Sequence, residues 1–137
     1  MEHNMFCFQC EQTAGCTGCT GRAGVCGKQA DTAKLQDALT GALIALARTI
    51  QGKQTISAKI SKQILDGLFT TVTNVNFNDV TIQQRIDAIH RELPAGTADY
   101  DMNKVWDAQE DVRSLKSLIL FGVRGMAAYA HHALVLG

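Results

Sequence analysis

The chain has 137 residues, of which 46% are hydrophobic and 19% are charged, with 13 basic residues balancing 13 acidic ones. This length suits one domain, and the composition excludes an intrinsically disordered chain. A net charge of zero gives no electrostatic basis for binding nucleic acid or an anionic membrane. No run reaches 18 uninterrupted apolar residues, and residues 1–12 do not have the pattern of a signal peptide. We therefore expect a globular, cytoplasmic protein with no membrane span.

All the cysteines of the chain, five in number, lie within residues 6–28, FCFQCEQTAGCTGCTGRAGVCGK. A secreted disulfide framework usually spreads an even number of cysteines along the chain, so this crowded set argues against disulfides. In a reducing compartment, such a cluster is more typical of metal binding or redox chemistry.

The cysteine spacing leaves two kinds of metal site open. Cys7 and Cys10 form one C-x2-C pair, Cys16 and Cys19 form another, and Cys26 follows. The two pairs are five residues apart, whereas zinc ribbons usually separate theirs by about 15–20 residues. Iron–sulfur clusters also take four thiolates and often collect them from one loop. Five glycines favour the cluster over zinc, because they let the backbone wrap tightly and turn N–H groups toward sulfur: Gly15, Gly18, Gly21, Gly24 and Gly27.

The first two segments after this loop have helical periodicity. Apolar residues recur at intervals of three and four in residues 31–50, which predicts an amphipathic helix with Asp31 or Thr32 as its N-cap and Gly52 as its stop. A second helix is predicted over 59–75, although the β-branched residues at its end leave a strand open there.

Two more helices complete the prediction. Asn78 or Asp79 caps a third helix, which Pro94 terminates. Residues 94–108 have no period and are predicted to form a loop. The last helix is expected over 111–136, with one apolar stripe facing the core: Val112, Leu115, Leu118, Ile119, Val123, Met126, Ala130 and Leu134.

These elements predict an all-α fold, a helical bundle of three to four helices with an N-terminal Cys/Gly-rich loop. We expect one domain over residues 1–137, in which residues 5–28 form the iron–sulfur loop and residues 31–137 form the bundle.

Four segments resemble the N-terminal domain of the hybrid-cluster proteins, a family also called prismane or hydroxylamine reductase. They are MFCFQCEQTAG, TGCTGRAGVCGK, TNVNFND and EDVRSLKSLILFGVRGMAAYAHHALVLG. The resemblance runs from Met5 to Gly137 and is weak at about residues 52–62 and 94–108. Its most specific part is the cysteine loop ending in C-G-K, followed by TAKLQD.

The resemblance implies which cysteines bind a cluster. Cys7 and Cys10 match the opening pair of family ligands, Cys19 matches the third because eight residues separate it from Cys10, and Cys26 matches the fourth. Cys16 matches no family ligand. The chain has one more residue between Cys19 and Cys26 than the commonest family pattern. The spacing after Cys10 resembles that of members with a [4Fe–4S] cluster and not that of the [2Fe–2S] class.

The resemblance also implies what this chain lacks. Family members are several times longer, and later domains supply the His, Glu and Cys ligands of their substrate-reducing centre. No cysteine follows Cys26, so we expect an electron-transfer domain of a hydroxylamine reductase-type oxidoreductase with no catalytic residue of its own. Whether the chain alone is an enzyme stays open. Its expected partners are a redox protein or the remaining hybrid-cluster domains, with homo-oligomers possible. A structural zinc module and a helical assembly module without redox role are the alternatives.

Three residues outside the ligand set bear on this site. Lys28 either favours the anionic centre or is an ordinary surface lysine. Asp37 is expected on a solvated helix face. Trp106 is expected to anchor the 94–108 loop to the bundle.

Overall fold

The computed structural model describes residues 5–137. Residues 1–4, which the sequence assigns to the single domain, lie outside the described residues. The described part contains helices and two isolated β-bridges but no strand, so the all-α prediction is confirmed. The elements in chain order are η1 (Glu11–Cys16), α1 (Ala30–Ile50), α2 (Ala58–Thr70), α3 (Asp79–His90), α4 (Asn103–Trp106) and α5 (Glu110–Leu136).

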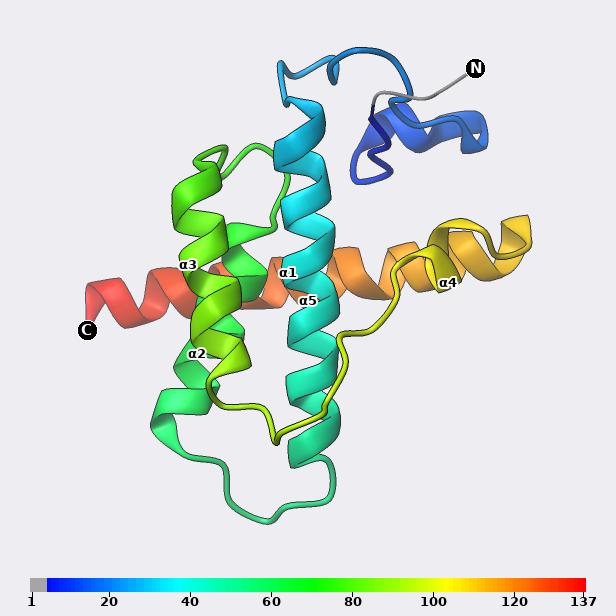
Figure 1. Cartoon of the computed structure of the whole chain (residues 1–137). Helices are drawn as coiled ribbons and strands as arrows, with labels where there is room; N and C mark the ends of the chain where they lie inside the picture. Colours follow the sequence, from blue (N-terminus) through cyan, green and yellow to red (C-terminus); the bar gives the residue numbers. More distant parts are fainter. Residues whose placement is uncertain (1–4) are drawn as a thin grey trace.

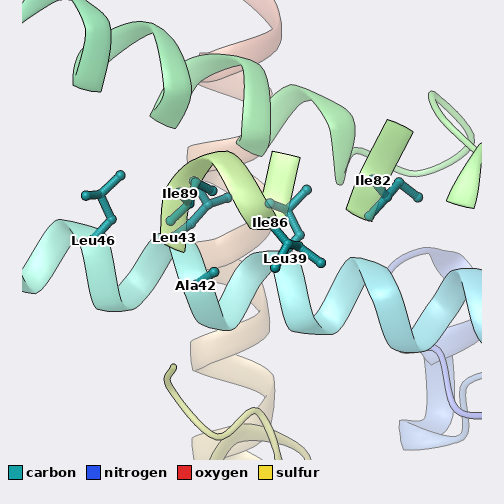
Figure 2. Close-up of a cluster of buried hydrophobic side chains, with 7 residues drawn as sticks. All are labelled: Leu39, Ala42, Leu43, Leu46, Ile82, Ile86 and Ile89. Carbon is teal, nitrogen blue, oxygen red and sulfur yellow. The ribbon is translucent and has the colours of Figure 1, made fainter. Parts of the chain in front are cut away.

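Helices α1, α2 and α3 run side by side and form the main bundle (Figure 1). Apolar residues spaced three and four apart on α1 face a matching row on α3, because that spacing keeps side chains on one side of a helix (Figure 2). Partly buried apolar residues of α2 close the third side of this core. The core residues are Leu39, Ala42, Leu43, Leu46, Ile82, Ile86 and Ile89.

The predicted helix ends agree with the structure in part. Asn78 is the N-cap of α3, and its side chain accepts a hydrogen bond from the backbone N–H of Thr81 at 3.0 Å. Gly52 has a φ of +79° directly after α1, as expected for a helix stop. The predicted cap of α1 is wrong, because the helix begins at Ala30 and Thr32 instead donates to Asp79. The end of α2 continues as a turn and not as a strand.

The prediction of a loop over residues 94–108 is wrong in part, because the short helix α4 forms within it and contributes to a second apolar cluster. Val105 and Trp106 of α4 are buried together with Phe8 from the cysteine loop and Met102. The indole Nε1 of Trp106 donates to Asp37 on α1 at 3.0 Å. Trp106 therefore anchors this segment to the bundle as expected, and the same cluster anchors the cysteine loop.

Helix α5 crosses the other helices instead of running along them (Figure 1). It packs mainly against α2 and α4, and only Arg124 and Ala127 are buried on it. The prediction that its apolar stripe faces the core is wrong, because Leu115, Leu118 and Met126 are each more than 60% exposed. A helix that crosses a bundle touches it over a short stretch, so most of its apolar side chains stay uncovered.

By length and composition, α5 is the one helix within residues 5–137 that could cross a membrane. Only 11% of its most apolar 18-residue window is buried. One such helix is weak evidence and does not identify a membrane protein.

Candidate metal centre

The first and third predicted ligands are held beside each other by the backbone. Cys7 N–H donates to the Cys19 carbonyl at 3.0 Å, and Cys19 N–H donates to the Cys7 carbonyl at 2.9 Å. Residues that exchange both hydrogen bonds in this way are direct cross-strand neighbours, so their side chains leave the same face of the bridge. Two thiols distant in sequence are thereby brought together.

The extended backbone around Cys7 separates its side chain from those of its neighbours. Successive side chains point to opposite sides of an extended segment. Phe6 and Phe8 accordingly both lie against Trp106, with ring centroids 5.6 and 6.1 Å from it. In the sequence F-C-F, the two aromatic rings thus pack into the second apolar cluster, and the side chain of Cys7 points to the opposite side of the segment.

Turns position the other two ligands. Cys10 is the N-cap of η1, and its carbonyl accepts from Thr13 N–H at 2.8 Å. Cys26 lies in a turn in which Gly27 N–H donates to the Gly24 carbonyl and Gly24 N–H donates to the Lys28 carbonyl. Gly27 has a φ of +88°, a conformation that L side chains rarely adopt.

All four predicted ligands, Cys7, Cys10, Cys19 and Cys26, line one small cavity of about 20 Å³. Within residues 5–137, no three Cys, His, Asp or Glu side chains lie close enough together to hold a single metal ion. The four cysteines therefore border one small space, and no three of them form a group close enough to bind a single metal ion.

Cys16 does not line that cavity. Its backbone is in a left-handed conformation, with a φ of +58°. Its thiol donates to the Glu110 carboxylate at 3.2 Å, at the start of α5. The fifth cysteine is therefore directed away from the other four and contacts the last helix.

Lys28 is buried at this site, with 1% of its surface exposed, so the alternative of a surface lysine is wrong. Its Nζ lies 3.6 Å from the sulfur of Cys7 and 5.8 Å from the centroid of the Phe77 ring. Burial raises the pKa of the Cys7 thiol, while the positive charge of Lys28 and the Gln9 backbone oppose that rise.

A half-buried carboxylate, Asp37, and a buried guanidinium, Arg124, interact electrostatically near Lys28. Burial raises the pKa of Asp37 to about 6, against the opposing effects of its hydrogen bond from Trp106 and of the positive charges of Arg124 and Lys28. Arg124 is buried on α5 and donates to the hydroxyls of Thr71 and Thr40, each at 3.0 Å. The prediction that Asp37 lies on a solvated face is wrong, because its side chain is half-buried and accepts the hydrogen bond from Trp106 of α4.

A larger cavity of about 660 Å³ adjoins the first. Cys10 and Cys26 line both cavities. Its opposite wall includes Leu118 and Phe121 of α5, both mainly exposed. Two of the four predicted ligands are therefore reachable from the surface through this opening.

The donor set and its surroundings suit an anionic iron–sulfur cluster. Four thiols line one cavity, and a buried ammonium lies next to one of them. The Gln9 backbone also forms a hydrogen bond that lowers the pKa of the Cys7 thiol. Positive charge and N–H groups near ligand sulfurs stabilise the charge of such clusters.

Comparison with known proteins identifies the family. The Prismane/CO dehydrogenase family model matches residues 5–137. The chain belongs to this family. Family membership implies iron–sulfur cofactors and confirms the resemblance to hybrid-cluster proteins.

Similar curated proteins are named hydroxylamine reductase. That of Desulfovibrio desulfuricans is 39% identical over an alignment that covers 100% of this chain, and that of Clostridium perfringens is 37% identical over 98% of it. That of Porphyromonas gingivalis is 37% identical over 100% of the chain. The chain spans about 30% of the length of each relative. It therefore corresponds to the N-terminal domain of this kind of protein.

Proposed function

We propose that the chain binds one iron–sulfur cluster, of the [4Fe–4S] type, through Cys7, Cys10, Cys19 and Cys26. The proposal depends on one observation, that these four cysteines line a common cavity while Cys16 is directed to Glu110. When bound, such a cluster takes up and releases one electron at a time. The chain then acts as the electron-transfer domain of a hydroxylamine reductase-type oxidoreductase, and substrate reduction belongs to other domains.

The close spacing of the four ligands in one glycine-rich loop supports a cluster over a structural zinc ion. Zinc ribbons usually separate their two cysteine pairs by about 15–20 residues, whereas iron–sulfur clusters often collect their thiolates from one loop. Cys26 is exposed on its glycine turn, so no core side chain fixes its thiol.

The residues of this chain hold the ligands and provide a route for electrons. The paired hydrogen bonds between Cys7 and Cys19 fix the inner side of the site, and the aromatic contacts of Phe6 and Phe8 with Trp106 fix that side to the bundle. Cys10 and Cys26 form the outer side, next to the larger cavity. Electrons therefore enter or leave through the outer side, where a redox partner reaches the ligand sulfurs.

The exposed apolar face of α5 is the docking surface for the remaining domains of a hydroxylamine reductase-type protein. Its main members are Leu115, Leu118, Ile119, Phe121, Met126 and Tyr129, each more than 60% exposed. Several large apolar side chains exposed along one helix are typical of an interaction site. The relatives supply a suitable occupant, because this chain corresponds to only about 30% of their length and the remainder is available to cover α5. Self-association through α5 is the competing outcome.

A cytoplasmic location agrees with the pattern of the cysteines, which crowd one loop as metal ligands do and are not spread along the chain as in a disulfide framework. Thiols persist in reducing compartments, where iron–sulfur proteins keep their ligands available.

Anaerobic purification followed by iron, sulfide and zinc analysis tests the proposed function. We expect brown protein with a broad visible absorption and with iron and sulfide in equal amounts, about four of each per chain for a [4Fe–4S] cluster. Colourless protein with one zinc per chain would instead select the structural zinc module. Protein with neither metal after reconstitution with iron and sulfide would leave only the helical assembly module.

A further inference from the structure

Lys28 is a buried cation without a carboxylate partner in the described part of the chain. It is 1% exposed, and no Asp or Glu oxygen among residues 5–137 forms an ion pair with it. A buried charge is costly unless an opposite charge or hydrogen bonds compensate it. The hydrogen-bond acceptor within reach of its ammonium is the sulfur of Cys7 at 3.6 Å.

The surroundings hold the ammonium at that sulfur. The Lys28 carbonyl accepts from Gly24 N–H at 2.8 Å, which fixes the backbone at the end of the Cys26 turn. The Phe77 ring lies 5.8 Å from Nζ on another side. Asp37 is close enough to interact electrostatically, but its carboxylate accepts from the Trp106 indole instead. The lysine is therefore built to face an anion at Cys7.

We propose that Lys28 is a positioning residue that stabilises the reduced state of the bound cluster and so sets its reduction potential. This inference rests on the proposed function. Reduction adds one negative charge to the cluster, which one electron from an external donor supplies. A fixed positive charge next to a ligand sulfur stabilises the more negative state more than the less negative one. Lys28 therefore raises the reduction potential relative to the same site without it.

A buried charge interacts more strongly than an exposed one, so we expect Lys28 to raise the reduction potential more than an exposed basic residue does. Lys34 on α1 provides the contrast, since its side chain is 73% exposed and pairs with Asp31 at 3.9 Å. Removing either charge changes the net charge of the chain equally. Only removal of Lys28 takes a charge away from a ligand sulfur.

The test is a redox titration of the anaerobically loaded chain, with the potential followed by electron paramagnetic resonance or visible absorption. Lys28→Met keeps the long apolar stem and removes the charge, Lys28→Arg keeps the charge, and Lys34→Met is the matched control. We expect a more negative potential for Lys28→Met, and values close to that of the unmodified chain for Lys28→Arg and Lys34→Met. Iron and sulfide contents are measured on the same samples.

Each outcome decides the inference. An unchanged potential in a fully loaded Lys28→Met chain overturns it, as does an equal shift in Lys34→Met. If Lys28→Met retains helical circular dichroism but binds no cluster, loading of Lys28→Arg supports the role of the charge. Failure of both Lys28 variants to load indicates a steric role and overturns the inference. Failure of the unmodified chain to load a cluster contradicts the proposed function itself.

Discussion

Cys7 and Cys19 exchange two backbone hydrogen bonds, of 3.0 and 2.9 Å, and so place two thiols on one face of the cysteine loop. Gly18 makes this pairing possible. Its φ is +67°, and a Cβ at this position would lie 2.6 Å from the Cys7 carbonyl oxygen. Any side chain at residue 18 must therefore push the two segments apart.

Gly18→Ala is expected to lower cluster occupancy strongly while leaving the helical bundle folded, because the main core lies on α1 and α3. Gly15→Ala is the matched control. Gly15 has a similar φ of +70°, but a Cβ at this position would meet nothing within 4 Å. The Gly15→Ala variant therefore carries only the left-handed backbone cost of about 1–2 kcal/mol. Iron content per chain and far-ultraviolet circular dichroism measure the two effects. Equal iron contents in the two variants would contradict the role assigned to the bridge.

Asp37→Asn is expected to make the metal-free chain more stable at pH 7. The pKa of Asp37 is raised to about 6, so between about pH 4 and 6 the folded chain holds a proton that the unfolded chain has lost. The free energy of unfolding therefore falls as pH rises from about 4 to 6, because the folded chain must ionise a carboxyl that its surroundings keep protonated. Asparagine removes this cost at pH 7. For a partly exposed carboxyl, the gain on substitution is on the order of 2 kcal/mol.

Urea unfolding at pH 4.5 and at pH 7 measures this effect, since asparagine can still accept the hydrogen bond from Trp106. The two proteins should differ more at pH 7 than at pH 4.5. Other shifted groups titrate elsewhere, because the pKa of Asp66 is lowered and that of the Cys7 thiol is raised. A constant difference between the two proteins across this range would show that Asp37 has an ordinary pKa.

The sequence predicted most of the fold and pointed to four cysteines that line one cavity in the structure, but it did not predict which residues are buried. Local signals sufficed for the α3 cap at Asn78, because the capping hydrogen bond lies within one turn. The apolar pattern of α5 predicted a helix but not its exposure, since burial depends on the direction in which a helix crosses its neighbours. For the same reason, the burial of Lys28 stayed open and Asp37 was wrongly expected on a solvated face. Residues distant in sequence, Phe77 and Trp106, enclose them, and no local spacing reveals those contacts.

Ile119→Asp is expected to abolish docking at α5 without affecting folding. Ile119 is 65% exposed, so its replacement should change the free energy of unfolding by no more than about 0.5 kcal/mol. Leu46→Ala, a substitution at a fully buried position, should cost about 2–5 kcal/mol by comparison.

Docking is measured by titrating the chain with the part of the Desulfovibrio desulfuricans hydroxylamine reductase that lies outside the matched region. Analytical ultracentrifugation of the chain alone measures self-association. Binding that Ile119→Asp removes would support the docking surface. Binding that survives the substitution would assign docking to another face, and a dimer dispersed by Ile119→Asp would show that a second copy covers α5.

The most direct test of the four-cysteine cluster is the iron content of Cys19→Ser compared with that of Cys16→Ser after anaerobic reconstitution. The two cysteines belong to the same C-x2-C pair, but only Cys19 lines the cavity with Cys7, Cys10 and Cys26. We predict that Cys16→Ser retains the full iron and sulfide content and that Cys19→Ser loses most of both. Retention of the cluster by Cys19→Ser together with its loss from Cys16→Ser would contradict the assignment.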